Sequence, residues 1–191
     1  KVSILKDGIQ SEVFKVDSLQ TKEIKISTLV VDPPKWSAEH PDLFTLVVHL
    51  KDKKGATLEA FTKKIGFREV EYKNKILTVN GVPVKLNGVN SHMHDPEHGQ
   101  AVPLETLRKD LVIMKQFNIN CVRTCHYPPT PEYIEMADEL GMYIFDEVGD
   151  ESHMNEYLSD DPKWTEMYRD RSRKLVYRDR NHPSVIVWSA G

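Results

Sequence analysis

Apolar and polar positions alternate with a period of two residues over the first third of the chain. The apolar positions, set among lysine, glutamate, serine and threonine, are Val2, Ile4, Val13, Phe14, Val16, Ile24, Ile26, the run 43–50, Leu58 and Ala60. Turn signals at Asp7-Gly8 and 52–55, and a proline-bearing loop over 32–41, separate these segments. Short strands without intervening helices predict a β-sandwich over residues 1–66. About five strands are visible where seven or more are usual, so we expect an incomplete sandwich.

The pattern changes near residue 84, after hairpins that we predict over 67–84 around the turn signal Asn80-Gly81. Strands are expected at 84–90, 120–124, 142–146 and 185–188, and helices at 104–117, 131–140 and 162–177. Leu107, Leu111 and Met114 have helical spacing, and Gly141 is placed to end the second helix. Four strands alternating with three helices predict a parallel sheet with right-handed crossovers.

Length and charge narrow the classes of partner. The 191 residues are enough for one large domain or two modest ones. The formal net charge is −3 with both signs interspersed, which argues against a nucleic-acid-binding face. No apolar run approaches the roughly 18 residues that span a bilayer, so no membrane partner is expected. The chain begins at Lys1 rather than Met, so we interpret it as a piece of a longer protein and leave the compartment open between the cytoplasm and the periplasm or exterior.

Polar residues follow every strand of the predicted parallel sheet. They are Asn90 and His92 after the first strand, Arg123 and His126 after the second, Asp146-Glu147 with Glu151 and His153 after the third, and Trp188-Ser189 at the fourth. The carboxyl ends of parallel strands meet at one rim, where barrel enzymes carry their active sites. Four polar strand ends together therefore predict an active site.

Each of these residues also has a plain structural reading. His92 by itself could be a hydrogen-bonded loop histidine, and Arg123 could form an internal ion pair with Asp146 or Glu147. Glu151 and His153 could be a solvated loop, and as metal ligands one carboxylate and one imidazole are too few without further oxygens.

The two cysteines are not expected to form a disulfide. Cys121 and Cys125 lie four residues apart within one strand and turn, and they are more typical of buried thiols than of nucleophiles.

Seven short motifs follow one another in a family-specific order: 65–69, Asn80-Gly81 with 88–90, 98–100, Val122-Arg123 with 126–128, Asp146-Glu147, 179–184 and Trp188-Ser189. In this the chain resembles glycoside hydrolase family 2, and the resemblance is closest to its β-galactosidases. It implies that residues 1–66 are part of an immunoglobulin-like β-sandwich and that residues 67–191 are the N-terminal half of a (β/α)8 TIM barrel. The parent enzyme would hydrolyse terminal non-reducing β-D-galactose residues with retention, in carbohydrate catabolism.

The resemblance also implies roles for individual residues. His92 and His126 match histidines that contact the galactosyl group, and Arg123 matches an arginine that supports the catalytic carboxylates. Asn90 and Trp188 are further expected substrate contacts. Glu151 and His153 match two protein ligands of an active-site Mg²⁺. Met93 and Asp95 depart from the family pattern.

Neither catalytic glutamate of the family is expected within the chain. The resemblance places the acid/base directly after Gly191 and the nucleophile further on, so we expect residues 1–191 to be inactive and to bind metal weakly. The first and fourth strands would keep open edges, through which self-association is expected. Three alternatives remain: a β-glucuronidase or a β-mannosidase of the same family, or a noncatalytic carbohydrate-binding module.

Overall fold

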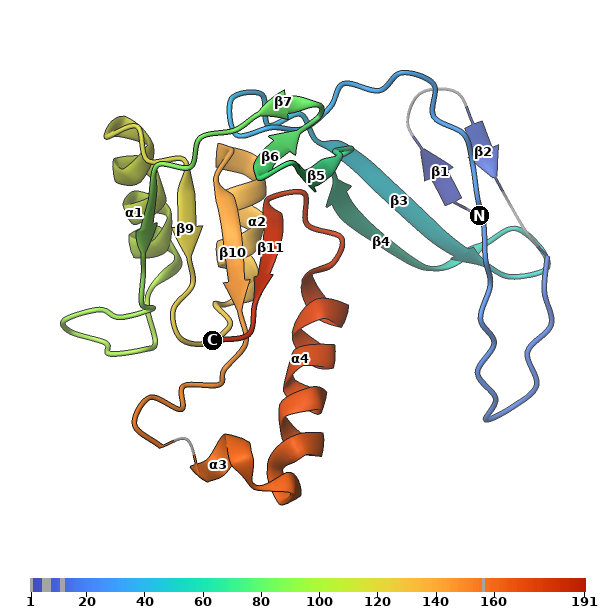
Figure 1. The fold of residues 1–191 in the computed structure, drawn as a ribbon. Coiled ribbons are helices and arrows are strands. Elements are labelled where there is room, and N and C mark those ends of the chain that lie inside the picture. Colours follow the sequence, from blue (N-terminus) through green and yellow to red (C-terminus); the bar gives the residue numbers. More distant parts are fainter. Residues whose placement is uncertain (1, 5–7, 11–12, 156) are drawn as a thin grey trace. The chain divides into compact units, whose positions relative to one another are not determined.

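Two units make up the computed structural model, which describes residues 2–4, 8–10, 13–155 and 157–191 (Figure 1). One unit consists of Lys1–Pro34 and Leu43–Ile65, and the other of Lys35–Asp42 and Gly66–Gly191. The segment Lys35–Asp42, which the sequence analysis assigned with residues 1–66, thus groups with the second unit. Each unit is described by itself below.

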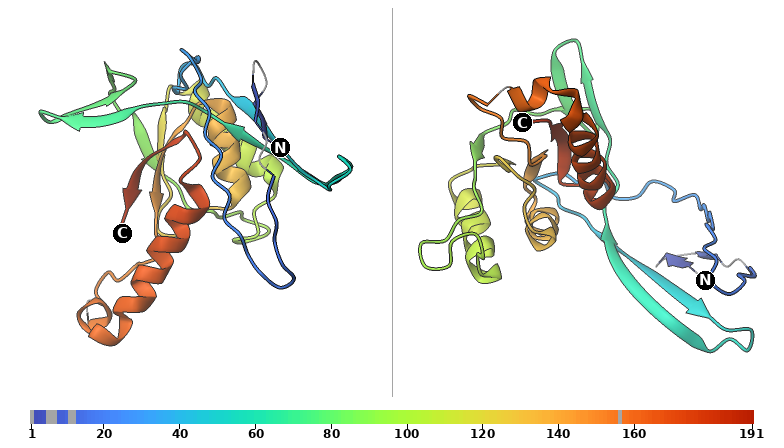
Figure 2. Two further views of the ribbon diagram at one scale, coloured as in Figure 1. Left: turned by 90° about the vertical axis from the view of Figure 1, so that its right-hand side faces the viewer. Right: turned by 90° about the horizontal axis from the view of Figure 1, so that it is seen from below.

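The first unit is a four-stranded antiparallel sheet in the order β2-β1-β3-β4. The strands are β1 (Val2–Ile4), β2 (Gly8–Gln10), β3 (Phe44–Lys51) and β4 (Thr57–Ile65). Figure 2 shows β3 and β4 as one long paired ribbon. Asp52 closes their turn, because its Oδ1 accepts hydrogen bonds of 2.8 Å from the backbone N–H groups of Lys54 and Ala56. None of residues 13–34 and 43–65 is buried, as is typical of a sheet without a second layer packed on it.

The strands predicted around Val13–Val16 and at Ile24 and Ile26 are wrong. Apart from an isolated bridge between Lys35 and Phe67, residues 13–43 form no strand. Val13 is 99 % exposed, and no neighbouring strand pairs with this stretch. A period-two pattern forms a strand only where another strand accepts its backbone hydrogen bonds, and the described residues supply no such strand here.

The second unit contains a small antiparallel sheet with the strand order β5-β6-β7. It comprises β5 (Val70–Lys73), β6 (Ile76–Val79) and β7 (Val82–Pro83). The turn predicted at Asn80-Gly81 is confirmed, with φ values of 55° and 78°. A second turn at Asn74-Lys75, with φ values of 52° and 64°, joins β5 to β6.

The main sheet is fully parallel in the order β11-β10-β9-β8, which confirms the predicted alternation of strands and helices. Its strands are β8 (Gly88–Asn90), β9 (Cys121–Arg123), β10 (Tyr143–Glu147) and β11 (Val185–Ser189). The helices between them are α1 (Leu104–Gln116), α2 (Pro131–Leu140) and α4 (Thr165–Asp179). This alternation of parallel strands and helices is the arrangement predicted for part of a TIM barrel. β8 and β11 are the edge strands of the sheet, and self-association through them stays a prediction.

The segment between β10 and α4 differs from the prediction. It holds a short helix α3 (Tyr157–Asp160) that the sequence analysis did not anticipate. The predicted helix at 162–177 begins as a 3₁₀ turn, η1 (Pro162–Trp164). The side chain of Asp161 caps this turn by accepting a hydrogen bond of 3.0 Å from the N–H of Lys163.

Helices α1 and α2 cover one face of the main sheet (Figure 1). The apolar side chains of the two helices pack against the strand side chains on that face and form a hydrophobic core. The core includes Leu107, Leu111, Tyr133, Ile134, Ala137, Val122, Ile144 and Val185, each at most 2 % exposed. In the described part of the chain, no helix is both long and apolar enough to cross a membrane.

Trp36 ties the segment Lys35–Asp42 to the barrel unit. Its side chain is fully buried, and its Nε1 donates a hydrogen bond of 2.8 Å to the carbonyl oxygen of Asp138 on α2. The Asp138 carboxylate lies 2.6 Å from His182 Nδ1 and accepts a bond of 2.9 Å from the N–H of Ser184. Through these contacts α2 is joined both to Trp36 and to the start of β11.

We expect Gly141→Ala to destabilise the chain by about 2 kcal/mol. Gly141 ends α2 with φ 73°, and a Cβ there would overlap the carbonyl oxygen of Ala38. Gly81→Ala is the matched control, since Gly81 has φ 78° but open space around it. Urea denaturation of both variants measures the difference; equal losses would show that the Ala38 contact adds nothing to the backbone strain.

Candidate active site

The carboxyl ends of the four parallel strands bring polar residues together on one face of the main sheet. Asn90 is in register with Arg123, Arg123 with Phe145, and Glu147 with Ser189. Residues in register on neighbouring strands share a face, and alternate residues along one strand share it too. Asn90, Arg123, Glu147 and Ser189 therefore line the face opposite to the one covered by α1 and α2.

Glu147 is the centre of this group and is fully buried. Its two carboxylate oxygens accept hydrogen bonds from Arg123 Nε (2.5 Å) and a terminal guanidinium nitrogen of Arg123 (2.8 Å), from Ser189 Oγ (2.6 Å) and from His126 Nδ1 (2.8 Å). Burial raises the pKa of Glu147, but the bonds from Arg123, Ser189 and His126 outweigh it and hold the net pKa below the ordinary value. The carboxylate is thus ionised at neutral pH, and the internal pair weighed for Arg123 and Glu147 is present.

His126 is oriented by the carboxylate of Glu147. Its Nδ1 lies 2.8 Å from a Glu147 oxygen and 3.3 Å from the guanidinium of Arg123. The guanidinium has only donors and the carboxylate only acceptors, so the shorter contact places the proton on Nδ1. Glu151 also approaches, with its Oε2 3.3 Å from the same nitrogen. With the proton on Nδ1, the second ring nitrogen, Nε2, is an acceptor.

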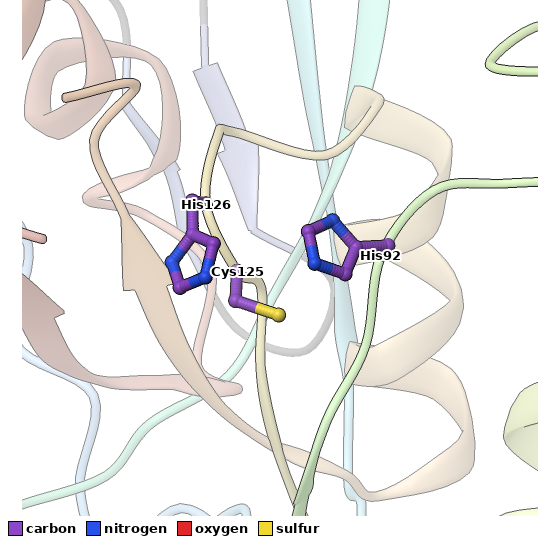
Figure 3. Close-up of side chains that lie close together, drawn as sticks. All are labelled: His92, Cys125 and His126. Atoms are coloured by element: carbon purple, nitrogen blue, oxygen red, sulfur yellow. The ribbon is translucent and has the colours of Figure 1, made fainter. Parts of the chain in front are cut away.

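His92 lies beside His126 across the rim. The two rings are 5.4 Å apart in an edge-on arrangement, and the ring of Tyr127 is 5.8 Å from that of His92. The side chain of Cys125 lies between the two histidines (Figure 3). The peptide bond between Cys125 and His126 is cis, which the sequence analysis did not predict.

Trp188 is not brought together with these residues. It is in register with Asp146, whereas the next residue, Ser189, is in register with Glu147. Strand alternation therefore directs Trp188 to the opposite face of the sheet, where its side chain is 41 % exposed. Trp188 lies at the end of β11, as predicted, but the sequence analysis did not consider to which face of the sheet its side chain points.

Glu151 and His153 lie in the loop after β10, and both are exposed. Glu151 Oε1 accepts a hydrogen bond of 3.0 Å from the backbone N–H of His153. The described residues do not assemble a third metal-binding group with these two side chains; the trio they do assemble is His92, Cys125 and His126. One carboxylate and one imidazole do not complete a Mg²⁺ site.

The sequence analysis missed a buried acidic pair on the opposite face of the sheet. Asp146 on β10 and Asp179 at the end of α4 are both fully buried. Arg178 binds Asp179 at 2.6–2.9 Å, whereas neither carboxylate oxygen of Asp146 has a hydrogen-bond partner within the described chain. Burial, and then the nearby Asp179 carboxylate, raise the pKa of Asp146 to about 8. Successive side chains of a strand point to opposite faces, so the position of Asp146 directly before Glu147 could have indicated that it faces the other side of the sheet.

A hollow of about 340 Å³ lies elsewhere, between α4 and the segments after β9 and β10. Pro128, Val148, Gly149, Arg171 and Leu175 are among the residues that line it, and none of the predicted site residues does. The polar strand ends, rather than this hollow, are therefore the candidate active site.

The cysteines behave as predicted: Cys121 and Cys125 are free and buried.

Two family models match the chain. Residues 70–191 match "Glycosyl hydrolases family 2, TIM barrel domain", and residues 3–68 match "Glycosyl hydrolases family 2". Among curated proteins, a β-galactosidase of Pectobacterium atrosepticum is 45 % identical over 166 residues, which cover 85 % of this chain and 16 % of that protein. A β-galactosidase of Photobacterium profundum is 44 % identical over 174 residues, which cover 88 % and 17 %. The chain thus spans about a sixth of the length of these relatives.

Among solved structures, a β-glucuronidase from Ruminococcus gnavus in complex with D-glucuronic acid is similar to this chain. The TM-score is 0.76 at 31 % identity, and the match covers 84 % of this chain and 27 % of that one. The same enzyme in complex with a C6-substituted uronic isofagomine gives a TM-score of 0.77 with the same coverage.

Proposed function

The chain belongs to glycoside hydrolase family 2, and from that premise we propose that it is part of a retaining β-galactosidase that removes terminal β-D-galactose. The observation that carries the choice of sugar is the identity of 44–45 % with curated β-galactosidases, against 31 % with the structurally similar β-glucuronidase. β-Glucuronidase is the second candidate, because its structures match 84 % of the chain.

The rim residues have chemistry suited to a sugar. In this proposal His92, His126 and Asn90 contact galactosyl hydroxyl groups, since imidazole and amide groups both donate and accept hydrogen bonds. Arg123, held by Glu147, places a fixed positive charge at the rim, where it stabilises neighbouring carboxylates. Trp188 stays outside this set, because it points to the opposite face.

The acid/base and the nucleophile of the reaction are proposed to lie outside residues 1–191. Retaining hydrolysis needs two carboxyl groups roughly 5 Å apart, one to protonate the leaving oxygen and one to attack the sugar. Glu147 is unsuited to either part because Arg123, Ser189 and His126 occupy both of its oxygens. We therefore propose that residues 1–191 alone do not hydrolyse the substrate.

Glu151 and His153 are proposed to supply two ligands of a Mg²⁺ ion in the longer protein. A hard cation of this kind needs further oxygen ligands, so these two residues by themselves would hold it weakly.

Hydrolysis assays on two clones test the proposal. One clone carries residues 1–191, and the other continues to the native stop codon. Each is given an aryl β-galactoside, β-glucuronide and β-mannoside with and without Mg²⁺. We expect turnover of the galactoside by the extended clone only, stimulated by Mg²⁺.

Each other outcome points to a different correction. Preference of the extended clone for the glucuronide or the mannoside would replace the proposed substrate. Turnover by residues 1–191 alone would show that the catalytic carboxylates lie within them, with Glu147 and Glu151 the first to replace. Sugar binding by calorimetry without hydrolysis by either clone would favour a carbohydrate-binding module.

A further inference from the structure

Three potential metal ligands converge at the rim. Each of His92, Cys125 and His126 offers one ligand atom, and these three atoms all lie within 4.8 Å of one another. Figure 3 shows both imidazole rings turned toward the side on which the thiol lies. The residues come from the ends of two adjacent strands, β8 and β9, so the sheet itself holds them together.

The chemistry of this trio differs from that of the proposed magnesium ligands. A thiolate and two imidazoles select zinc and similar borderline or soft ions, whereas Mg²⁺ prefers oxygen. In a tetrahedral zinc site with bonds of 2.0–2.3 Å, ligand atoms lie about 3.3–3.6 Å from each other. Small side-chain rotations would close the present spacing, and His92 is exposed and able to rotate.

One ligand is already oriented for a metal. His126 donates a hydrogen bond of 2.8 Å from its Nδ1–H to the buried carboxylate of Glu147, which leaves the lone pair of Nε2 available to a metal ion. Zinc-bound histidines commonly make this carboxylate contact, which fixes the ring and raises its basicity. Cys125 is only 3 % exposed, so its side chain is shielded from bulk solvent.

We propose that His92, Cys125 and His126 bind a zinc ion, with the fourth position open to solvent. Since His92 and His126 stand at the rim, a bound ion occupies the space in front of them and competes with any molecule that contacts both rings. The proposed zinc ligands do not include Glu151 or His153, although Glu151 Oε2 lies 3.3 Å from His126 Nδ1, and zinc belongs to a different class of metal from Mg²⁺.

Cobalt provides the direct test on tag-free residues 1–191. Co²⁺ added to the reduced chain should produce a thiolate-to-cobalt charge-transfer band in the near ultraviolet, and Zn²⁺ should abolish it while Mg²⁺ should not. Cys125→Ala should remove the band. Cys121→Ala, which changes the other buried thiol four residues earlier, should keep it.

A second variant keeps the test independent of folding at the buried cysteine. His92→Asn changes an exposed side chain and should weaken zinc binding at least about tenfold, measured by competition with a chromogenic chelator. The proposal is overturned if cobalt binds without the thiolate band, if the band survives in Cys125→Ala, if zinc affinity is unchanged in His92→Asn, or if neither metal binds.

Discussion

Replacing Asp146 with asparagine should remove a fall in folding stability that the parent chain shows between about pH 4 and pH 8. In the folded chain, burial and Asp179 raise the pKa of Asp146 to about 8, whereas an unfolded aspartate titrates near 3.9. Between these values the folded state binds more protons than the unfolded state. Stability therefore falls as pH rises, by at most about 5 kcal/mol over the whole interval.

The measurement is the free energy of unfolding by urea at pH 5, 6, 7 and 8 for the parent and for Asp146→Asn. Asparagine is neutral throughout, so the variant should gain stability relative to the parent at each step upward in pH. Asp170→Asn is the control, because Asp170 is exposed on α4 and pairs with the exposed Lys174. A parent-minus-variant difference that does not change with pH would contradict the raised pKa of Asp146.

Glu147→Gln should destabilise the chain by about 3 kcal/mol at pH 7. The glutamine keeps the volume but presents an NH₂ group to Arg123 and His126, which are both donors, and it removes the charge that neutralises the guanidinium. Loss of one partner of a buried pair usually costs about 3–5 kcal/mol; the lower end applies because Arg123 is 34 % exposed.

Glu166→Gln provides the comparison for this variant. Glu166 pairs with Arg169 on α4, and both side chains are more than 60 % exposed, so its replacement should cost less than about 1 kcal/mol. Urea denaturation of the two variants at pH 7 measures both values. Equal, small losses would mean that solvent screens the Glu147 cluster as fully as it screens the surface pair.

Sequence reasoning succeeded where local pattern and tertiary structure agree. Helix α2 was predicted at its observed bounds, because apolar spacing, Pro131 at its start and Gly141 at its end all act locally. The pairing of Arg123 with Glu147 was also accessible, since both residues end adjacent parallel strands. Because parallel strands bring their carboxyl ends to one edge of the sheet, a single sequence is enough to predict which residues lie near one another there.

The wrong predictions share a physical cause: the residues that contact a given residue in the fold can lie far from it in the sequence. Val13 and Ile24 stand in strand-like alternation, but no strand among the described residues pairs with them. Trp188 was placed at the rim without regard to the face on which alternation puts it. Cys125 was read as a buried thiol, which it is, but its position between His92 and His126 depends on the fold of two strand ends.

The contact between Trp36 and Asp138 joins residues 102 positions apart in the chain. A ribosome that adds about 5–20 residues per second needs roughly 5–20 s to make that interval. During this time Trp36 has been synthesised but the helix that will bury it does not yet exist. The large aromatic side chain therefore stays without its final packing partner until α2 has left the exit tunnel.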